Sequence, residues 1–270
     1  MKSLNLKQKC NWLRLEALEL AEKSGKAHIG GTFSAIEILA VLYYGGVLKF
    51  NPKKPNWELR DRFILSKGHA CPALYAIFSD LSIISKKDYE TYGKNGGLGG
   101  QLETSIRGVD FNTGSIGHSV GVCVGIALAA KMQKKNFRAV TLIGDSEFYE
   151  GSIWESIVFA QENKITNVTV IVDRNRLMVT DIIDDDGLYM NFKQRIENFG
   201  WAYFECDGHD TEELLRIFKI IRKVNKPSIL IAKTVKGKGV SFFENNLKWH
   251  NLSIESQELE LARKELLDNK

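Results

Sequence analysis

The chain has 270 residues and a formal net charge of +4, with 44% hydrophobic and 26% charged residues. This composition is typical of a globular protein with a sizeable core, and it excludes a disordered or collagen-like chain. Lys and Arg residues occur at most in doublets, a distribution that argues against a surface for binding nucleic acid.

The cysteine spacing and the apolar runs limit the class of protein further. The four cysteines are far apart, and none forms a CxxC pair, which excludes a zinc finger or a small disulfide scaffold. Residues 1–7 contain no apolar core of a secretory signal. The longest apolar run, residues 120–130, is too short to span a bilayer. We therefore expect a cytoplasmic protein without membrane contact.

Short β-branched runs alternate with helical patterns along the chain. Continuous apolar strands of this kind favour a parallel sheet that is covered by helices on both faces. The alternation predicts a doubly wound α/β fold with right-handed crossovers. No linker divides the chain, so residues 1–270 are expected to form one domain. The expected strands are residues 62–66, 139–143, 168–172, 201–205 and 228–232, and the main expected helices are residues 4–23, 210–225 and 253–267.

Two polar residues follow neighbouring predicted strands. Asp145 comes directly after the strand that ends in Ile143-Gly144, and Asn175 comes after the next strand. In a parallel sheet both strand ends open on the same edge, where ligands bind. One carboxylate and one amide oxygen suit Mg²⁺ or Ca²⁺, with water and phosphate oxygens completing the coordination. A turn Asp and a turn Asn are the plainer interpretation, and it is the strand-end positions that favour a site.

A glycine-rich loop at residues 112–119 precedes an apolar helix. The amino terminus of that helix would direct free N–H groups at an anion such as a diphosphate. Gly117, Gly121 and Gly125 recur every four residues, which predicts one small-residue helical face. Such a face indicates either tight internal packing or a contact between subunits.

The order of these motifs resembles that of the transketolases. The resemblance covers nearly the whole chain and includes a His-containing turn, a second His motif, a Thr-Gly-Ser loop, a Gly-Asp…Asn metal motif, an Asp-Gly-His-Asp turn and a Gly-Lys segment followed by Trp-His. These motifs lie at residues 24–31, 61–69, 113–115, 144–175, 207–210 and 236–250.

The chain resembles only the amino-terminal half of a transketolase, the domain that holds the diphosphate of thiamine diphosphate. The resemblance implies a split enzyme, in which a second chain supplies the pyrimidine-binding domain and the active site lies between the two chains. An α2β2 heterotetramer is the expected assembly. Glu150 and Glu155 resemble acidic positions at the dimer contact of that family.

The resemblance also implies the role of each site residue. The cofactor would supply the carbanion chemistry of two-carbon ketol transfer between a ketose donor, free or phosphorylated, and an aldose acceptor. His28 and His250 would transfer protons at the substrate, and His69 would position the diphosphate and the donor. Asp145, Asn175 and the carbonyl of Leu177 would bind Mg²⁺, for which Ca²⁺ can substitute. The cofactor-binding set is His69, Thr113, Gly114, Ser115, Gly144, Asp145, Ser146, Glu150 and Asn175.

Three positions depart from the family pattern. Gln101 stands where a histidine is expected to bind the first hydroxyl of the donor, and an amide can donate a hydrogen bond but carries no charge. Ser146 replaces the last glycine of a Gly-Asp-Gly loop, and His118 introduces an ionisable group near the cofactor. We expect Gln101 and His118 to face the substrate, and the donor to differ from an ordinary pentulose phosphate. His209 is expected to be mainly structural.

Three other functions share part of this pattern. The α subunit of a 2-oxo acid dehydrogenase would have the same metal motif and need a partner chain, but it would not need His28, His69 and His250. A ligation of pyruvate like that of 1-deoxyxylulose-phosphate synthase is a minor alternative. A non-catalytic subunit that binds Mg²⁺ and a diphosphate is the third, and it too would not need the histidines.

Overall fold

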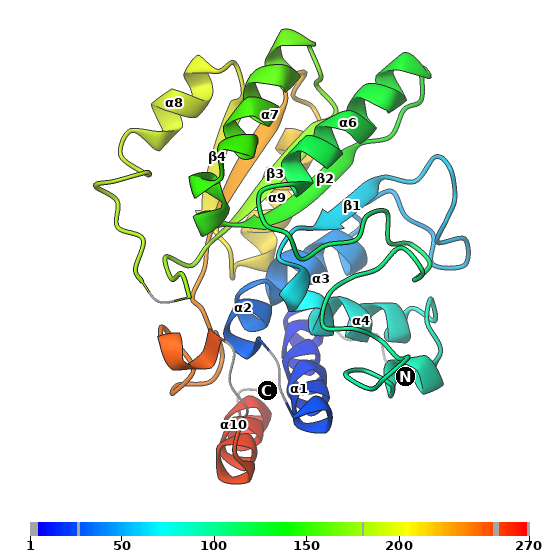
Figure 1. Cartoon of the computed structure of the whole chain (residues 1–270), viewed down its shortest axis with the longest axis vertical. Helices are drawn as coiled ribbons and strands as arrows, with labels where there is room; N and C mark the ends of the chain where they lie inside the picture. Colours follow the sequence, from blue (N-terminus) through cyan, green and yellow to red (C-terminus); the bar gives the residue numbers. More distant parts are fainter. Residues whose placement is uncertain (1–4, 26–27, 180, 251–253, 269–270) are drawn as a thin grey trace.

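The structure is a computed structural model that describes residues 5–25, 28–179, 181–250 and 254–268. Its centre is a five-stranded sheet in the order β1-β2-β3-β5-β4, in which every pair of neighbours is parallel (Figure 1). The predicted α/β class with a parallel sheet is confirmed. The strands are β1 (Arg62–Leu65), β2 (Ala139–Gly144), β3 (Val168–Arg174), β4 (Ala202–Asp207) and β5 (Ser228–Lys233).

Helices surround this sheet. In the described residues, three short 3₁₀ turns lie between a strand and the helix that follows it. The α-helices are α1 (Leu6–Ser24), α2 (Ile29–Ser34), α3 (Ile36–Tyr44), α4 (Cys71–Asp80), α5 (Lys86–Tyr89), α6 (Ser119–Met132), α7 (Gly151–Glu162), α8 (Phe192–Asn198), α9 (Thr211–Ile221) and α10 (Ser256–Asp268). The 3₁₀ turns are η1 (Gly68–Ala70), η2 (Asp145–Tyr149) and η3 (Leu247–His250). No helix in the described ranges combines the length and apolarity needed to cross a bilayer.

Successive strand residues alternate between two apolar cores, one on each face of the sheet. Val170 of β3 packs with the α6, α7 and α8 side chains, while the next residue, Ile171, packs with those of α1, α3, α4 and α9. This alternation is the period-two geometry of a strand, and it explains why the central strands are mainly apolar. Both faces of β2, β3 and β5 are buried, whereas the edge strand β4 is mostly half-buried or exposed.

A third apolar cluster lies outside the two sheet cores. Phe33 of α2 and Trp249 of η3 are buried there together with Leu259 of α10. The cluster ties α2, which follows His28, to the segment that carries His250. Residues more than two hundred positions apart in the sequence are thus fixed beside each other at one end of the sheet.

A capping residue fixes the start of the predicted helix α9. The Asp210 side chain accepts hydrogen bonds from the N–H groups of Glu212 and Glu213, so α9 begins where predicted, but it ends earlier, at Ile221.

The expectation that Gly117 shares the small-residue face of α6 is wrong. Gly117 lies before the helix, with φ +81°, while Gly121 and Gly125 are exposed on α6.

Candidate active site

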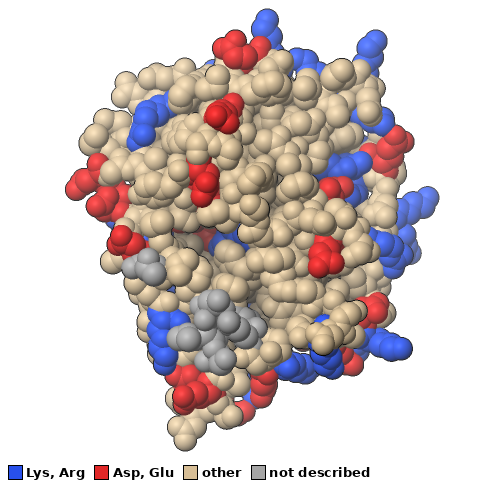
Figure 2. Space-filling model, in the orientation of Figure 1, with Lys and Arg blue, Asp and Glu red and all other residues tan. Residues whose placement is uncertain are grey.

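The carboxyl ends of β2 and β3 carry the predicted metal ligands. Asp145 begins η2 directly after β2, and Asn175 follows β3, whose register pairs Asp173 with Gly144. Asp145, Asn175 and Leu177 line one pocket, as predicted for neighbouring strands of a parallel sheet. Figure 2 shows acidic and basic atoms recessed in a hollow on this face of the molecule.

Hydrogen bonds fix the orientation of the Asp145 carboxylate. Its Oδ1 accepts from the N–H of Ser146 at 2.9 Å, and its Oδ2 accepts from the N–H of Arg176 at 2.6 Å and from the Arg174 guanidinium at 3.1 Å. Burial and the nearby Asp173 raise the pKa of Asp145 above its ordinary value. A bound cation would relieve this unfavourable burial of negative charge.

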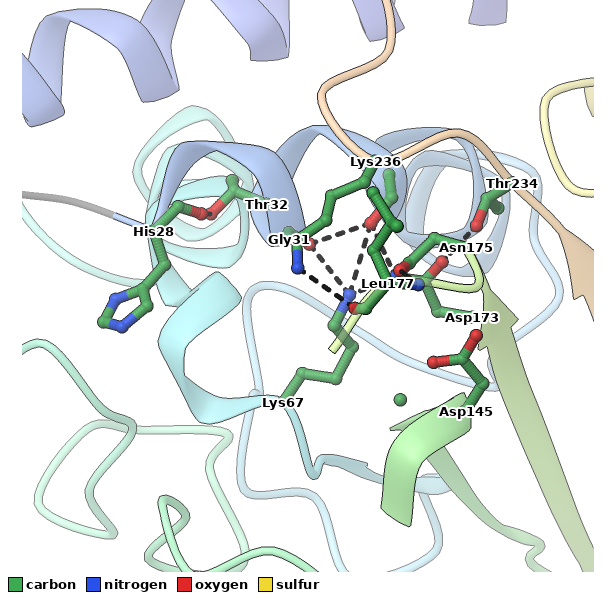
Figure 3. Close-up of polar contacts among 12 residues, drawn as sticks. His28, Gly31, Thr32, Lys67, Asp145, Asp173, Asn175, Leu177, Thr234 and Lys236 are labelled. Carbon is green, nitrogen blue, oxygen red and sulfur yellow. Dashed lines mark hydrogen bonds and ion pairs between the residues drawn. The ribbon is translucent and has the colours of Figure 1, made fainter. Parts of the chain in front are cut away.

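A buried ion pair lies beside this edge. The Lys67 ammonium contacts the Asp173 carboxylate and donates to the carbonyl of Gly31 at 2.9 Å. The hydroxyl groups of Ser34 and Thr234 also donate to Asp173. Burial alone would raise the pKa of Asp173, but Lys67 and these donors hold it below its ordinary value. Figure 3 shows Lys67 reaching toward Gly31, with Asp173 and Asp145 at the neighbouring strand ends.

Three imidazole rings converge beside the Asp145–Asn175 edge of the sheet. His28 directly precedes α2, His69 lies in η1 and His250 ends η3. The ring centroids are 5.0 Å apart for His28 and His69, 5.6 Å for His28 and His250, and 5.8 Å for His69 and His250. The structure therefore brings together the three histidines that the sequence motifs single out.

Lys236 links His250 to the segment that follows Asn175. The motif at residues 236–250 contains both Lys236 and His250, but the sequence did not predict that they are in contact. Its Nζ donates to the carbonyls of Leu177 and Met178 at 3.0 and 2.9 Å and lies 2.8 Å from His250 Nδ1. Because carbonyls only accept, the third N–H of the ammonium points to Nδ1. His250 Nδ1 is then the acceptor, and the neutral ring carries its proton on Nε2.

Burial keeps two of the histidines neutral. Desolvation, with the Lys67 and Lys236 ammonium groups nearby, lowers the pKa of His250 to about 4 and that of His69 well below its ordinary value. Desolvation also lowers the pKa of Lys236 to about 8, which leaves it charged at pH 7. At neutral pH both imidazoles therefore act as hydrogen-bonding groups rather than as cations.

These lowered pKa values predict an acid-labile fold. Between pH 6.5 and about 4 the unfolded chain binds a proton at position 250 that the folded chain does not, so the free energy of unfolding falls as the pH drops through this window. Denaturant unfolding of the wild type and His250→Asn between pH 4.5 and 7.5 measures this. The wild-type slope should exceed that of the variant, and equal slopes would contradict the lowered pKa.

Close backbone packing shapes the wall of the site next to the histidines. A Cβ atom placed on Gly31 would lie 2.9 Å from His69 Nε2, and one placed on Gly30 would lie 3.0 Å from the carbonyl oxygen of Trp249. A side chain at Gly31 would therefore displace the His69 ring, and one at Gly30 would press on the backbone at Trp249.

The predicted cofactor loop borders the same pocket through Ile116. Gly114 and Ser115 are exposed, and Gly114 adopts φ +129°, a conformation that favours glycine. Gln101 Oε1 and Thr113 Oγ1 are buried against Gly68, and neither atom has a hydrogen-bond partner within the described residues. A buried polar atom without a partner is costly, which favours a ligand or water at this point.

The remaining predicted residues do not line this pocket. Glu150 precedes α7, and its Cβ would lie 2.6 Å from a Cβ on Gly117. Glu155 is exposed on α7, and His118 is exposed before α6, where its Nδ1 lies 3.1 Å from the Ile116 carbonyl. His209 is structural, as expected: Nδ1 contacts Glu37 at 2.9 Å, and Nε2 accepts from the N–H of Val235.

The oxygen atoms present fit a magnesium diphosphate. Asp145, Asn175 and Leu177 offer one carboxylate, one amide and one carbonyl oxygen, the hard donors that Mg²⁺ binds together with phosphate oxygens and water. Lys236 lines the same pocket and would offset part of the charge of the phosphates, whereas the charge of Lys67 is paired with Asp173. Within the described ranges, no cluster of three or more His, Cys, Asp or Glu side chains offers a different metal site.

Comparison with known proteins agrees with this geometry. Residues 6–269 match the family described as transketolase, thiamine diphosphate binding domain. The chain is 36% identical to one of the subunits of the apulose-4-phosphate transketolase of Phocaeicola vulgatus, over 98% of this chain and 94% of the relative. It is 32% identical to the 6-deoxy-6-sulfo-D-fructose transketolase subunit SqwG of Clostridium sp., over 97% and 96%.

Full-length transketolases match over less than half of their own length. The human transketolase is 34% identical over 91% of this chain and 39% of that protein. The crystal structure of the Campylobacter jejuni transketolase superimposes with a TM-score of 0.89 at 30% identity, over 97% of this chain and 43% of that one. The chain thus belongs to the transketolase family, as its thiamine diphosphate-binding domain.

Proposed function

We propose that the chain is the diphosphate-binding subunit of a two-chain transketolase, which transfers a two-carbon ketol unit from a ketose or ketose phosphate to an aldose. The convergence of His28, His69 and His250 beside the Asp145–Asn175 edge is the observation that carries this proposal. A subunit that only binds a diphosphate would not need three imidazoles at this place.

The contacts indicate a role for each residue of the site. Thiamine diphosphate, when bound, supplies the carbanion stabilisation that carbon–carbon cleavage requires. Asp145, Asn175 and Leu177 would hold Mg²⁺ and through it the diphosphate. The proton on His250 Nε2, set by Lys236, would donate to a substrate oxygen, while His28 would exchange a proton with a substrate hydroxyl.

The magnesium site makes a separate prediction. Asp145→Asn removes the one charged ligand, so the affinity for pyrophosphate in the presence of Mg²⁺ should fall by roughly 100-fold or more. Titration calorimetry with inorganic pyrophosphate and Mg²⁺ measures this loss. The exposed residue Asp268 provides the control variant, Asp268→Asn, which should bind as the wild type does. Equal binding by Asp145→Asn would rule out Asp145 as a metal ligand.

A second chain completes the proposed enzyme. Both split relatives are named as subunits, and this chain covers nearly all of their length but only 39% of the human enzyme. We propose that the partner carries the pyrimidine-binding domain, in an α2β2 assembly. Ile116, Tyr149 and Phe159 are 44, 56 and 48% exposed around α6 and α7, a large apolar exposure for a surface without a partner.

The donor sugar is proposed to differ from xylulose 5-phosphate. Gln101, at the position where a histidine is expected, packs over Gly68 and Gly114 and offers no charge to a donor hydroxyl. The two split relatives are named for different sugars, so identity at this level does not fix the substrate.

One experiment tests the activity and the donor together. The chain is co-expressed with the product of a neighbouring gene that encodes a pyrimidine-binding domain, and the complex is assayed with thiamine diphosphate and Mg²⁺ against ketoses, ketose phosphates and 2-oxo acids. Ketol transfer from a ketose other than xylulose 5-phosphate is the expected result. Full activity with xylulose 5-phosphate would overturn the donor proposal, and turnover of 2-oxo acids alone would overturn the transketolase assignment.

A further inference from the structure

The Glu147 side chain, in η2, makes contacts that the proposed chemistry does not use. It is 1% exposed, and it is the only acidic residue between Asp145 and Glu150 in the sequence. Its Oε1 accepts from the N–H of Gly144 at 2.9 Å. Its Oε2 accepts from the Ser66 hydroxyl at 2.5 Å and from the N–H of Gly117 at 2.9 Å.

The three donors come from three separate segments that border the pocket. Ser66 follows β1, and its own N–H continues the sheet by donating to Leu142. Gly144 ends β2, one residue before Asp145. Gly117 ends the loop that carries the Thr-Gly-Ser motif. One carboxylate therefore holds two strand ends and the predicted cofactor loop in a fixed relation.

This contact also decides which N–H groups of the loop are free. The loop is anchored at Thr113, whose N–H donates to Leu102, and at Gly117, whose N–H is turned inward to Glu147. Between these anchors, Gly114, Ser115 and Ile116 are exposed, and no hydrogen bond among the described residues uses their N–H groups. The inward anchor at Gly117 thus leaves the middle of the loop able to present donors to an anion.

We infer that Glu147 is a positioning residue, which sets the 113–117 loop against the Asp145 edge so that the two together form the diphosphate seat. The inference rests on the proposed function for the identity of the anion, but the tie between the segments is independent of it. A carboxylate suits this position because only an acceptor with two oxygens serves three donors without placing a donor against a donor.

Glu147→Gln tests the inference, because a positioning role and a purely electrostatic role of Glu147 predict opposite changes in pyrophosphate affinity. The amide NH₂ would face at least one of the N–H and O–H donors, so the loop should loosen and pyrophosphate with Mg²⁺ should bind roughly 10-fold more weakly. If Glu147 acted only through its charge, removal of a negative group beside an anion site would instead strengthen binding. Unchanged or tighter binding would overturn the inference.

Amide hydrogen exchange measures the hydrogen bond between the Gly117 N–H and Glu147 directly, without any ligand. The Gly117 amide should exchange roughly 10-fold faster in Glu147→Gln than in the wild type, while the amides of α9, on the other face of the sheet, should not change. Unchanged exchange at Gly117 would overturn the inference. Glu162→Gln, an exposed carboxylate at the end of α7, is the matched control and should alter neither readout.

Ser66→Ala keeps the inference testable if Glu147→Gln does not fold. This variant removes one donor and leaves the charge and both amide bonds, so pyrophosphate affinity should fall by a smaller factor, roughly 3-fold. Binding equal to that of the wild type would count against the tie. If the wild type itself does not bind pyrophosphate with Mg²⁺, the proposed function fails, whereas the exchange of Gly117 still decides the role of Glu147.

Discussion

Replacement of Lys67 by methionine is expected to lower the free energy of unfolding by about 3–5 kcal/mol, because it leaves the Asp173 carboxylate buried without its counter-charge. The side chains of Lys67 and Asp173 are 4 and 0% exposed. Methionine fills a similar volume, so the loss reports the charge rather than a cavity. Urea unfolding at pH 7 measures the difference.

The control for this prediction is Lys87→Met, an exposed position in α5 where the change should stay within about 0.5 kcal/mol of the wild type. A double variant, Lys67→Met with Asp173→Leu, removes both charges and should recover part of the loss. A Lys67→Met protein as stable as the wild type would show that the hydroxyl groups of Ser34 and Thr234 alone satisfy Asp173.

The second large effect is expected on turnover. His28→Ala in the assembled enzyme should lower kcat by roughly 10²- to 10⁴-fold, the usual loss on removing a general acid or base. The fold should survive, because the His28 side chain does not cap α2, and the first turn is held by Thr32, which bonds to the His28 carbonyl. Steady-state kinetics and thiamine diphosphate affinity are measured on the same samples.

The cofactor affinity of His28→Ala should stay close to that of the wild type, since the diphosphate contacts proposed above lie at Asp145 and the 113–117 loop. His28→Gln retains a hydrogen-bond donor without a basic nitrogen, and it separates proton transfer from positioning. If either variant kept more than a tenth of the wild-type kcat, His28 would not be a proton-transfer group.

The strands were predictable from the sequence to within two residues, because each is a short run of mainly apolar or aromatic residues. The helices α2, α3 and α4 were not, since they are buried on nearly every side and lack the polar face that gives a helix its period. Residues 36–42, for example, are all buried. The helical pattern at residues 253–267 appears as α10, although residues 251–253 lie outside the described ranges.

Those parts of the candidate site that lie within single motifs could be predicted. The convergence of Asp145 and Asn175 follows from two adjacent strand ends, and the three histidines follow from motifs that resemble those of transketolases. The polar ties that hold the site together could not be foreseen, because their partners are distant along the chain. Lys67 and Asp173 are 106 positions apart, and Ser66 and Glu147 are 81 positions apart. Only the folded sheet brings such pairs into contact.

The packing of Gly30 and Gly31 limits where this enzyme could be adapted to another sugar. A methyl group at Gly31 would lie 2.9 Å from His69 Nε2, and one at Gly30 would lie 3.0 Å from the Trp249 carbonyl oxygen, so a substitution at either position would shift the groups that form that wall. Met178 and Val179 line the same pocket, and Val179 is 61% exposed. A library meant to retune donor preference should therefore randomise these two side chains together with Gln101 and leave the glycine pair untouched.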